Sequence, residues 1–120
     1  MSMIDTALTE ALSRFLDVNV FRHGLIASNL ANIDTPGYRT RDIDFRSELE
    51  RSYGEMQYAN FSPADRQVQG LIERPDGNNV SVERESLLLA ETQLRFQTGI
   101  ELLRKEFSRL SLAINEGRTP

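Results

Sequence analysis

The sequence predicts an all-α fold in which a long N-terminal helix and a long C-terminal helix pair as an antiparallel, coiled-coil-like bundle. Two observations indicate it. Apolar residues recur at helical spacing in the first and last thirds of the 120-residue chain, and the middle has no sustained period. A chain of this length is enough for one domain. We therefore expect a single domain over residues 1–120, with helices at about 4–33 and 82–116 and a largely extended or irregular segment between them.

A row of apolar residues predicts the N-terminal helix. The row repeats at alternating intervals of four and three residues and consists of Ile4, Leu8, Ala11, Phe15 and Val18. Heptad spacing of this kind places the side chains on one helix face. Farther along, the row takes in Arg22 and becomes mixed in character. The spacing alone leaves two interpretations open, an ordinary core-facing helix and one half of a coiled coil.

A longer row predicts the C-terminal helix. We call it the C-terminal seam, and it consists of Leu89, Phe96, Ile100, Leu103, Phe107, Leu110 and Ile114, with Gln93 as its polar member. Sustained over this length, the row favours a coiled-coil seam. Ser81 can cap the start of the helix, and Gly117 and Pro120 can end it. Leu88, Leu102 and Leu112 lie off the seam, so we expect contacts with more than one neighbour.

The middle of the chain carries two weaker patterns. Residues 44–51 can form a short helix with Phe45 and Leu49 on one side. Residues 75–78 read Pro-Asp-Gly-Asn and stand between short extended runs at 71–72 and 80–82. Asp-Gly between extended runs favours a β-hairpin, so a short hairpin is a possible element here.

The composition excludes several functional classes. Without cysteine there is neither a disulfide scaffold nor a thiolate metal site, and the net charge of -4 gives no nucleic-acid footprint. His23 is the only histidine, and no nucleophile and base stand in a recognisable motif. Asp42 and Asp44 have nothing apolar around them in the sequence to separate their pKa values. We therefore expect no enzyme activity, no metal or cofactor, and no small-molecule substrate.

Membrane and export patterns are also missing from the sequence. No window approaches the roughly 18 apolar residues that a membrane-spanning helix needs. The first twelve residues, MSMIDTALTEAL, lack the basic region and apolar run of a cleaved secretory signal. If the protein leaves the cytoplasm, we expect a route that needs no cleaved signal peptide.

The most specific motif lies where the N-terminal helix is predicted to end. Residues 28–38 read SNLANIDTPGY. This stretch resembles the N-terminal signature of the flagellar rod, hook and hook-associated proteins. In that signature, a helix ends in Ser-Asn-hydrophobic-Ala-Asn and is followed by Thr-Pro-Gly-aromatic. The matching residues are Asn29, Leu30, Asn32, Thr35, Pro36, Gly37 and Tyr38.

Two further segments resemble the FlgB type of proximal rod protein within that family. Residues 41–45, RDIDF, contain Asp42 and Phe45, and residues 76–80, DGNNV, contain Asn78 and Asn79. The short chain also fits this type, because distal rod and hook proteins carry extra domains. The resemblance extends over the whole chain and is weakest between Tyr53 and Arg74.

The resemblance implies a structural subunit of the flagellar basal-body rod. Family members pair their terminal helices and stack helically into a hollow rod around the export channel. The implied partners are other copies of the chain, other proximal rod proteins, the FliE-type adaptor, and the MS-ring and export-gate proteins. Export through the flagellar type III apparatus, without a cleaved signal peptide, would place the subunit in the periplasmic space.

A physical role for the signature follows from this assembly. Apolar seams can slide, and Asn at seam positions sets register at some loss of stability. We therefore expect Asn29 and Asn32 to bond the partner helix or the next subunit. Pro36 and Gly37 suit a type II turn, after which Tyr38 and Phe45 would anchor the extended segment by apolar contact. A small coiled-coil adaptor or a type III secretion chaperone is the alternative class. Such a protein would share the two helices but would need neither the asparagines nor the turn.

Overall fold

The computed structural model describes residues 6–55 and 61–118. The protein is long and thin, with principal extents of 73 × 26 × 18 Å. Its elements, in chain order, are α1 (Ala7–Ala31), β1 (Arg41–Asp42), α2 (Phe45–Gly54), β2 (Arg66–Gln67) and α3 (Val82–Arg118). The expectation of a mostly helical protein with two long terminal helices is confirmed.

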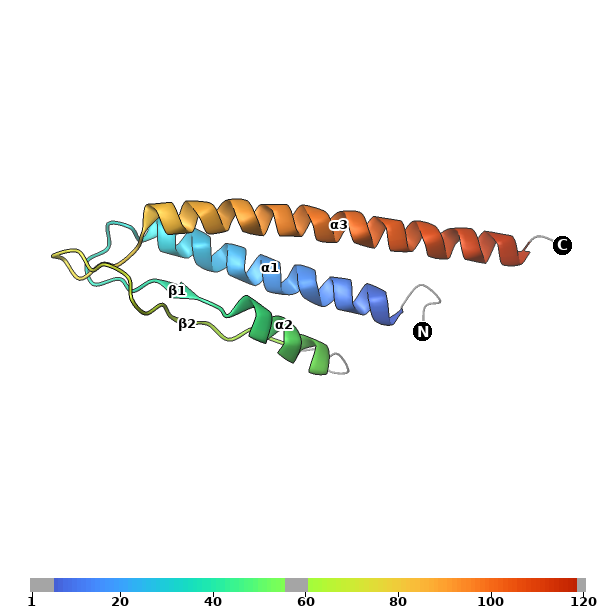
Figure 1. Ribbon diagram of the computed structural model, residues 1–120, viewed down its shortest axis with the longest axis horizontal. Helices are drawn as coiled ribbons and strands as arrows, with labels where there is room; N and C mark the ends of the chain where they lie inside the picture. The colour runs from blue at the N-terminus through green and yellow to red at the C-terminus, as the bar shows by residue number, and fades with distance from the viewer. Residues whose placement is uncertain (1–5, 56–60, 119–120) are drawn as a thin grey trace.

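The elements form three layers along the long axis (Figure 1). Helices α1 and α3 run antiparallel side by side, and α2 with the β1–β2 pair lies on the other side of α1. Helix α1 is therefore the central element, and α3 has only one of its sides covered. With 37 residues against 25, α3 is about 18 Å longer than α1.

Side-chain caps decide where the helices begin. Thr6 and Thr9 form a reciprocal capping box at the start of α1, with N···O distances of 3.1 and 2.7 Å. The predicted start near Ile4 lies outside the described residues. At α3, the Ser81 hydroxyl accepts a bond from the Arg84 backbone N–H at 3.2 Å, as expected. Helix α3 continues through Gly117 to Arg118, so Gly117 does not end it, and Pro120 lies beyond the described part.

The face that α3 turns toward α1 is not the C-terminal seam. The buried residues of α3 repeat every seven positions and are Glu85, Thr92, Gly99 and Glu106. The seam runs beside this row: Phe96 is 37% exposed and Phe107 is 41% exposed. The other apolar seam residues are half-buried, and Gln93 is exposed.

A glycine explains why this row is the one in contact. A Cβ added at Gly99 would lie 2.8 Å from Leu16 Cδ2 and 3.1 Å from Phe15 Cδ1 on α1. The backbones of α1 and α3 can come close together at Gly99 because glycine has no side chain. The spacing of apolar residues in the sequence does not predict such a contact. The Glu106 carboxylate in the same row is paired with Arg109 at 2.6 Å.

The short helix α2 packs its first residue against α1. Asp44 caps it by accepting a bond from the Ser47 N–H at 3.1 Å. The rings of Phe45 and Phe15 then meet edge to face, with centroids 5.8 Å apart. The expectation of a helix near 44–51 is confirmed, with the helix running three residues farther, to Gly54.

The hairpin expected around residues 75–78 is present only as a turn. The Gly77 N–H bonds the Arg74 carbonyl at 2.9 Å, and Gly77 has a φ of 87°. The flanking residues do not pair as strands. The two-stranded ladder joins Arg41 to Gln67 and Asp42 to Arg66 instead. Across the turn, the Arg74 N–H bonds the Asn78 carbonyl at 2.8 Å, and Asn79 then bonds Tyr38 and Thr40 instead of continuing a ladder with the residues before Arg74.

We predict that filling the glycine contact destabilises the fold. Gly99→Leu would force atoms into the space held by Phe15 and Leu16, at a loss of about 2 kcal/mol in the free energy of unfolding. Gly24→Leu is the matched control, since a Cβ there meets nothing within 4 Å. It should raise stability by about 0.5 kcal/mol through helix propensity. Urea unfolding followed by circular dichroism measures both. Equal stability of the two variants would contradict the close approach.

Candidate functional site

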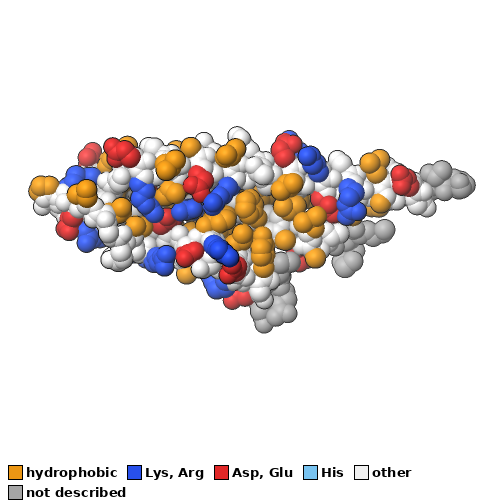
Figure 2. All heavy atoms as spheres, in the orientation of Figure 1, with side chains coloured by type: hydrophobic (Ala, Val, Ile, Leu, Met, Phe, Trp, Pro, Cys, Tyr) orange, Lys and Arg blue, Asp and Glu red, His pale blue; other side chains and the backbone are white. Residues whose placement is uncertain are grey.

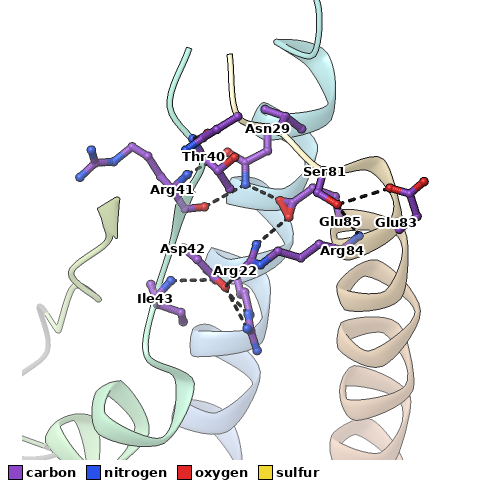
Figure 3. A network of polar contacts seen from close by, with 12 residues as sticks. Arg22, Asn29, Thr40, Arg41, Asp42, Ile43, Ser81, Glu83, Arg84 and Glu85 are labelled. Carbon is purple, nitrogen blue, oxygen red and sulfur yellow. Dashed lines mark hydrogen bonds and ion pairs between the residues drawn. The ribbon is translucent and has the colours of Figure 1, made fainter. Parts of the chain in front are cut away.

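The residues of the signature gather at one end of the helix pair, in what we call the polar junction. It comprises the end of α1, the segment at 32–42, the turn at 74–80 and the start of α3. The Asn29 side chain, 1% exposed, lies at its centre (Figure 3). Two stretches that are far apart in sequence converge here: the end of α1 with residues 32–42, and the turn at 74–80 with the start of α3.

The Asn29 amide uses all of its hydrogen-bonding capacity. Its Nδ2 donates to the Arg41 carbonyl at 2.9 Å and to the Glu85 carboxylate on α3. Its Oδ1 accepts from the Tyr38 hydroxyl at 2.9 Å and from the Arg41 N–H at 3.2 Å. An amide with two donors and two acceptors is the one group that satisfies this set. Asn29 therefore joins α1 to both the β1 segment and α3.

A chain of alternating charges lies on one side of Asn29 and meets it at Glu85 (Figure 3). Arg22 binds Asp42 in a bidentate pair with both N···O distances at 3.0 Å. Arg84 bridges Asp42 at 2.6 Å and Glu85 at 2.7 Å. Two cations face two carboxylates, so the cluster is neutral overall. Unpaired charges in a buried site would be strongly destabilising, and here each is paired.

The environment of Asp42 shifts its acidity. Burial raises the pKa of this carboxyl, but hydrogen bonds and charge from Arg22, the Ile43 N–H and a bond from Arg84 outweigh it. The net effect holds the pKa of Asp42 below its ordinary value of 3.8. The ionised form is thus the one that the folded protein stabilises.

Asn78 and Asn79 connect the second loop to the first. The Asn78 Nδ2 lies 2.9 Å from the Asn32 carbonyl, 3.0 Å from that of Ile33 and 2.9 Å from that of Thr35. These carbonyls belong to the end of α1 and the turn after it, where the helix leaves acceptors without partners. The Asn79 Oδ1 accepts from the buried Thr40 N–H at 2.7 Å.

The Thr35–Tyr38 segment forms the expected type II turn. The Tyr38 N–H bonds the Thr35 carbonyl at 3.2 Å, and Gly37 has a φ of 74°, which suits its third position. The Gly37 N–H also bonds the Asp76 carbonyl at 2.8 Å. A Cβ at Gly77 would lie 3.3 Å from the Gly37 Cα, so the two loops cross where both residues are glycine.

Two signature residues, Asn32 and Tyr38, make contacts other than those expected from the sequence. The Asn32 amide stays local, donating to the Ser28 carbonyl at 2.8 Å and accepting from Thr35, so it does not reach α3. Tyr38 is anchored through its hydroxyl to Asn29 rather than by apolar contact. Phe45 does make ring contacts, with the Arg95 guanidinium 4.5 Å from its centroid. Leu30 is half-buried.

Sequence reasoning missed four members of the polar junction: Arg22, Arg74, Arg84 and Glu85. Arg22 was visible as a charge interrupting an apolar helix row. Arg74 donates to the carbonyls of Val80 and Ile33, and only the crossing of the loops reveals it.

The geometry supports a structural rather than a catalytic role for the polar junction. Within the described residues, no group of three or more His, Asp or Glu side chains could hold a metal ion. The two buried carboxylates of the junction, Asp42 and Glu85, are each bound to an arginine. In the described part of the chain, no helix is long and apolar enough to span a bilayer. A thin helical hairpin, with its junction charges paired within the chain and its helices exposing large apolar side chains, is typical of structural assembly subunits.

Comparison with known proteins identifies the family. A sequence profile described as flagella basal body rod protein matches residues 25–39. The flagellar basal body rod protein FlgB of Cereibacter sphaeroides is 39% identical over 106 residues, covering 78% of this chain and 82% of that protein. FlgB of Salmonella typhimurium is 30% identical, covering 85% and 88%, and FlgB of Bacillus subtilis is 29% identical, covering 92% of each. The chain belongs to the FlgB family of flagellar basal body rod proteins. It is a structural protein and not an enzyme.

We predict that Asn29→Asp destabilises the protein by about 3 kcal/mol, because a second carboxylate would face Glu85 and two donors would be lost. Asn32→Asp is the control. The Asn32 side chain is half-buried, and the Ser28 carbonyl to which it donates can bond water instead. We therefore expect the free energy of unfolding to fall by no more than about 1 kcal/mol. The measurement is the urea midpoint of each purified variant. Similar losses at both positions would show that the Asn29 contacts do not hold the junction together.

A second prediction concerns acid. Since folding lowers the pKa of Asp42, its contribution to stability is present above the ordinary value of 3.8 and is lost as the pH falls through the lower folded value. At neutral pH, Asp42→Asn should be less stable than the parent protein. The difference between the two should shrink below about pH 4. Urea unfolding at a series of pH values tests this, and a difference that stays constant down to the lowest pH would refute it.

Proposed function

We propose that this chain is a subunit of the proximal rod of the flagellar basal body and that it assembles with its neighbours through the outer faces of its long helices. Copies of the chain and other proximal rod proteins would pack around the export channel, with coiled-coil contacts between subunits. Residues 1–120 would act as one rod-core domain.

The observation that carries this proposal is the exposed apolar surface of the helix pair. The exposed large apolar residues of α1 and α3 are Leu8, Val20, Val82, Leu87, Leu94, Phe96, Leu102, Phe107 and Leu112. Figure 2 shows hydrophobic side chains gathered along the middle of one face. Large exposed apolar surfaces on a protein often mark contacts with other proteins, so the number of exposed apolar side chains on α1 and α3 favours burial by neighbouring subunits.

The polar junction supports the proposal that contacts between subunits are made by the helix faces and not by the signature residues. Asn29 has no bonding capacity left for another subunit, and Asn78 is fully buried against the end of α1. Register would then be set in two stages. The junction fixes how α1 and α3 align within a subunit, and the helix faces, held in that alignment, present their apolar residues to the next subunit.

The family supports the wider context of the proposal. The proximal position would bring the chain against the FliE-type adaptor and the MS-ring and export-gate proteins. Delivery would be by the flagellar type III export apparatus, without a cleaved signal peptide, to the rod in the periplasmic space. An adaptor or secretion chaperone would instead stay in the cytoplasm with its client, and the relatives, named as rod proteins, disfavour that class.

We predict that Phe107→Asp blocks rod assembly while leaving the subunit folded. Phe107 is 41% exposed, so it is only partly packed within the subunit and a carboxylate at this position can still reach water in the monomer. A carboxylate buried between subunits would cost several kcal/mol, enough to reduce assembled basal bodies by about tenfold or more. Helix content by circular dichroism and export into the culture medium should be unchanged.

Ser108→Asp is the matched control, because it adds the same charge at the neighbouring exposed position. It should leave assembly near normal if Ser108 lies outside the contact. If a Phe107→Asp strain builds normal basal bodies and swims, the Phe107 face of α3 is not a contact between subunits. A subunit found only in the cytoplasm, never in purified basal bodies, would favour the chaperone class.

A further inference from the structure

A strip of α3 presents a cation without an ion pair beside two exposed leucines. Leu102 and Leu112 are 48% and 62% exposed, and Lys105 is also exposed. Lys105 makes no ion pair within the described residues, and Glu101, one turn before it, pairs with Arg104 instead, at 3.0 Å. The three side chains are spaced by three and seven residues, so they share one side of the helix. We call Leu102, Lys105 and Leu112 the lysine strip.

A second strip, of opposite charge, lies on the outer side of α1. Asp17 and Val20, three residues apart, are both exposed. Asp17 likewise makes no ion pair in the described part of the chain, and the guanidinium of Arg14, one turn before it, lies 5.6 Å from the centroid of the Phe61 ring. The same side of α1 continues with three small exposed residues, Gly24, Ala27 and Ala31. We call these five residues, from Asp17 to Ala31, the aspartate strip.

The two strips lie on different sides of the molecule. Arg95 is one heptad before Leu102, and its guanidinium lies 4.5 Å from the centroid of the Phe45 ring on α2. The lysine strip is therefore on the flank of α3 nearest α2. The aspartate strip is on the side of α1 that α2 and α3 leave open, because its residues are exposed. A contact between the two strips thus needs two molecules.

One register between two copies matches the charges and the apolar side chains together. Residue numbers run in opposite directions along antiparallel helices. A contact that places Lys105 against Asp17 therefore also places Leu102, three residues earlier, against Val20, three residues later. Opposite charges would select this register, and the leucine and valine would bury apolar surface beside them.

The neighbouring charges are compatible with this register. Residues 95–98 of α3 would face Gly24 and Ala27, where α1 carries no charge. At the other end, Glu10 would lie beside Leu112 and within one turn of Arg109, a cation. If Lys105 faced Glu10 instead, Leu102 would face a serine, and no apolar contact would accompany the ion pair.

We propose that the lysine strip of one copy of this chain binds the aspartate strip of a second copy, with Lys105 paired to Asp17 and Leu102 packed on Val20. The proposal deepens the proposed function and rests on it. Each copy in such a contact keeps one strip free, so further copies can add at both ends.

The register also sets an axial offset between neighbouring copies. Within one molecule Gly99 lies opposite Leu16, so Lys105 is level with Glu10. Pairing with Asp17, two helical turns farther along α1, shifts the next copy by about 10.5 Å along the long axis. A contact between unlike surfaces that is repeated with an axial shift produces a helical array instead of a closed two-fold dimer.

Charge exchange in cells tests the ion pair. Lys105→Glu and Asp17→Lys each place like charges at the contact, so each should reduce the number of assembled basal bodies by about tenfold. The double variant restores an opposite pair with the charges exchanged and should recover most of the parent number. Both residues are exposed, so circular dichroism should show unchanged helix content in all three purified proteins.

Glu10→Lys combined with Lys105→Glu is the matched control, because Glu10 is an exposed acid two turns before Asp17 on the same side of α1. It should not restore assembly. Rescue by Glu10→Lys in place of Asp17→Lys would overturn the proposed register. Single variants that assemble normally, or a double variant no better than the single ones, would overturn the contact itself.

Disulfide cross-linking tests the apolar part of the contact, since the chain has no cysteine. A chain that carries both Val20→Cys and Leu102→Cys is oxidised with copper phenanthroline in purified basal bodies. A disulfide needs Cα atoms within roughly 7 Å, so dimers and larger species report contact between these positions on different copies. Replacing Leu102→Cys by Ser108→Cys should lower the yield about tenfold. Equal yields from the two pairs would contradict the proposal.

The same strains separate this proposal from the proposed function. If the parent chain is missing from purified basal bodies, the proposed function itself fails. If the chain is present but the charge exchange gives no rescue, or the cysteines join it only to a different protein, the contact between copies is wrong and the rod assignment stands. Rescue together with cross-linked copies in purified basal bodies would support both.

Discussion

The rest of the structure depends on the buried amide of Asn29. A single side chain bonds the turn and the β1 strand that follow α1 and also the first turn of α3, so the two ends of the sequence are aligned at one point. Glu85 can be buried at 0% exposure because this amide and Arg84 both donate to it. Without these two donors, a buried carboxylate facing α1 would be strongly destabilising. The contact that fixes the register of α1 against α3 would then be lost.

The alignment made at the junction has consequences along the whole pair. Once Asn29 lies opposite Glu85, the antiparallel helices bring Gly99 against Phe15 and Leu16 fourteen residues farther along α3. The missing Cβ lets the backbones come close, and the row of Glu85, Thr92, Gly99 and Glu106 becomes the inner face. The larger apolar side chains are then displaced to the flanks. The register of α1 against α3 thus explains both the close packing between the two helices and the exposure of apolar side chains on their outer faces.

This division suits a protein that is folded first and assembled later. The amide of Asn29 and the buried charges of the junction find their partners within the chain, where geometry is under local control. Large apolar side chains on the outer faces of α1 and α3 stay exposed, and under the proposed function neighbouring subunits cover them. A subunit built in this way can present a defined helix pair to several different partners, as a rod that contains more than one kind of subunit requires. The balanced charges of the junction also mean that assembly need not disturb it.

Much of the fold could be predicted from the sequence, because local physics decides it. Heptad spacing, the Ser81 cap and the Pro36–Gly37 turn each act over a few residues, so the helices and the turn appear where they were expected. The signature likewise indicated the family. Tertiary structure alone decided which face of α3 is internal, since a glycine contact depends on what lies opposite and not on periodicity. It also decided that Asn29 reaches α3 while Asn32 does not, because only the crossing of the two loops sets which amide meets a partner from another segment.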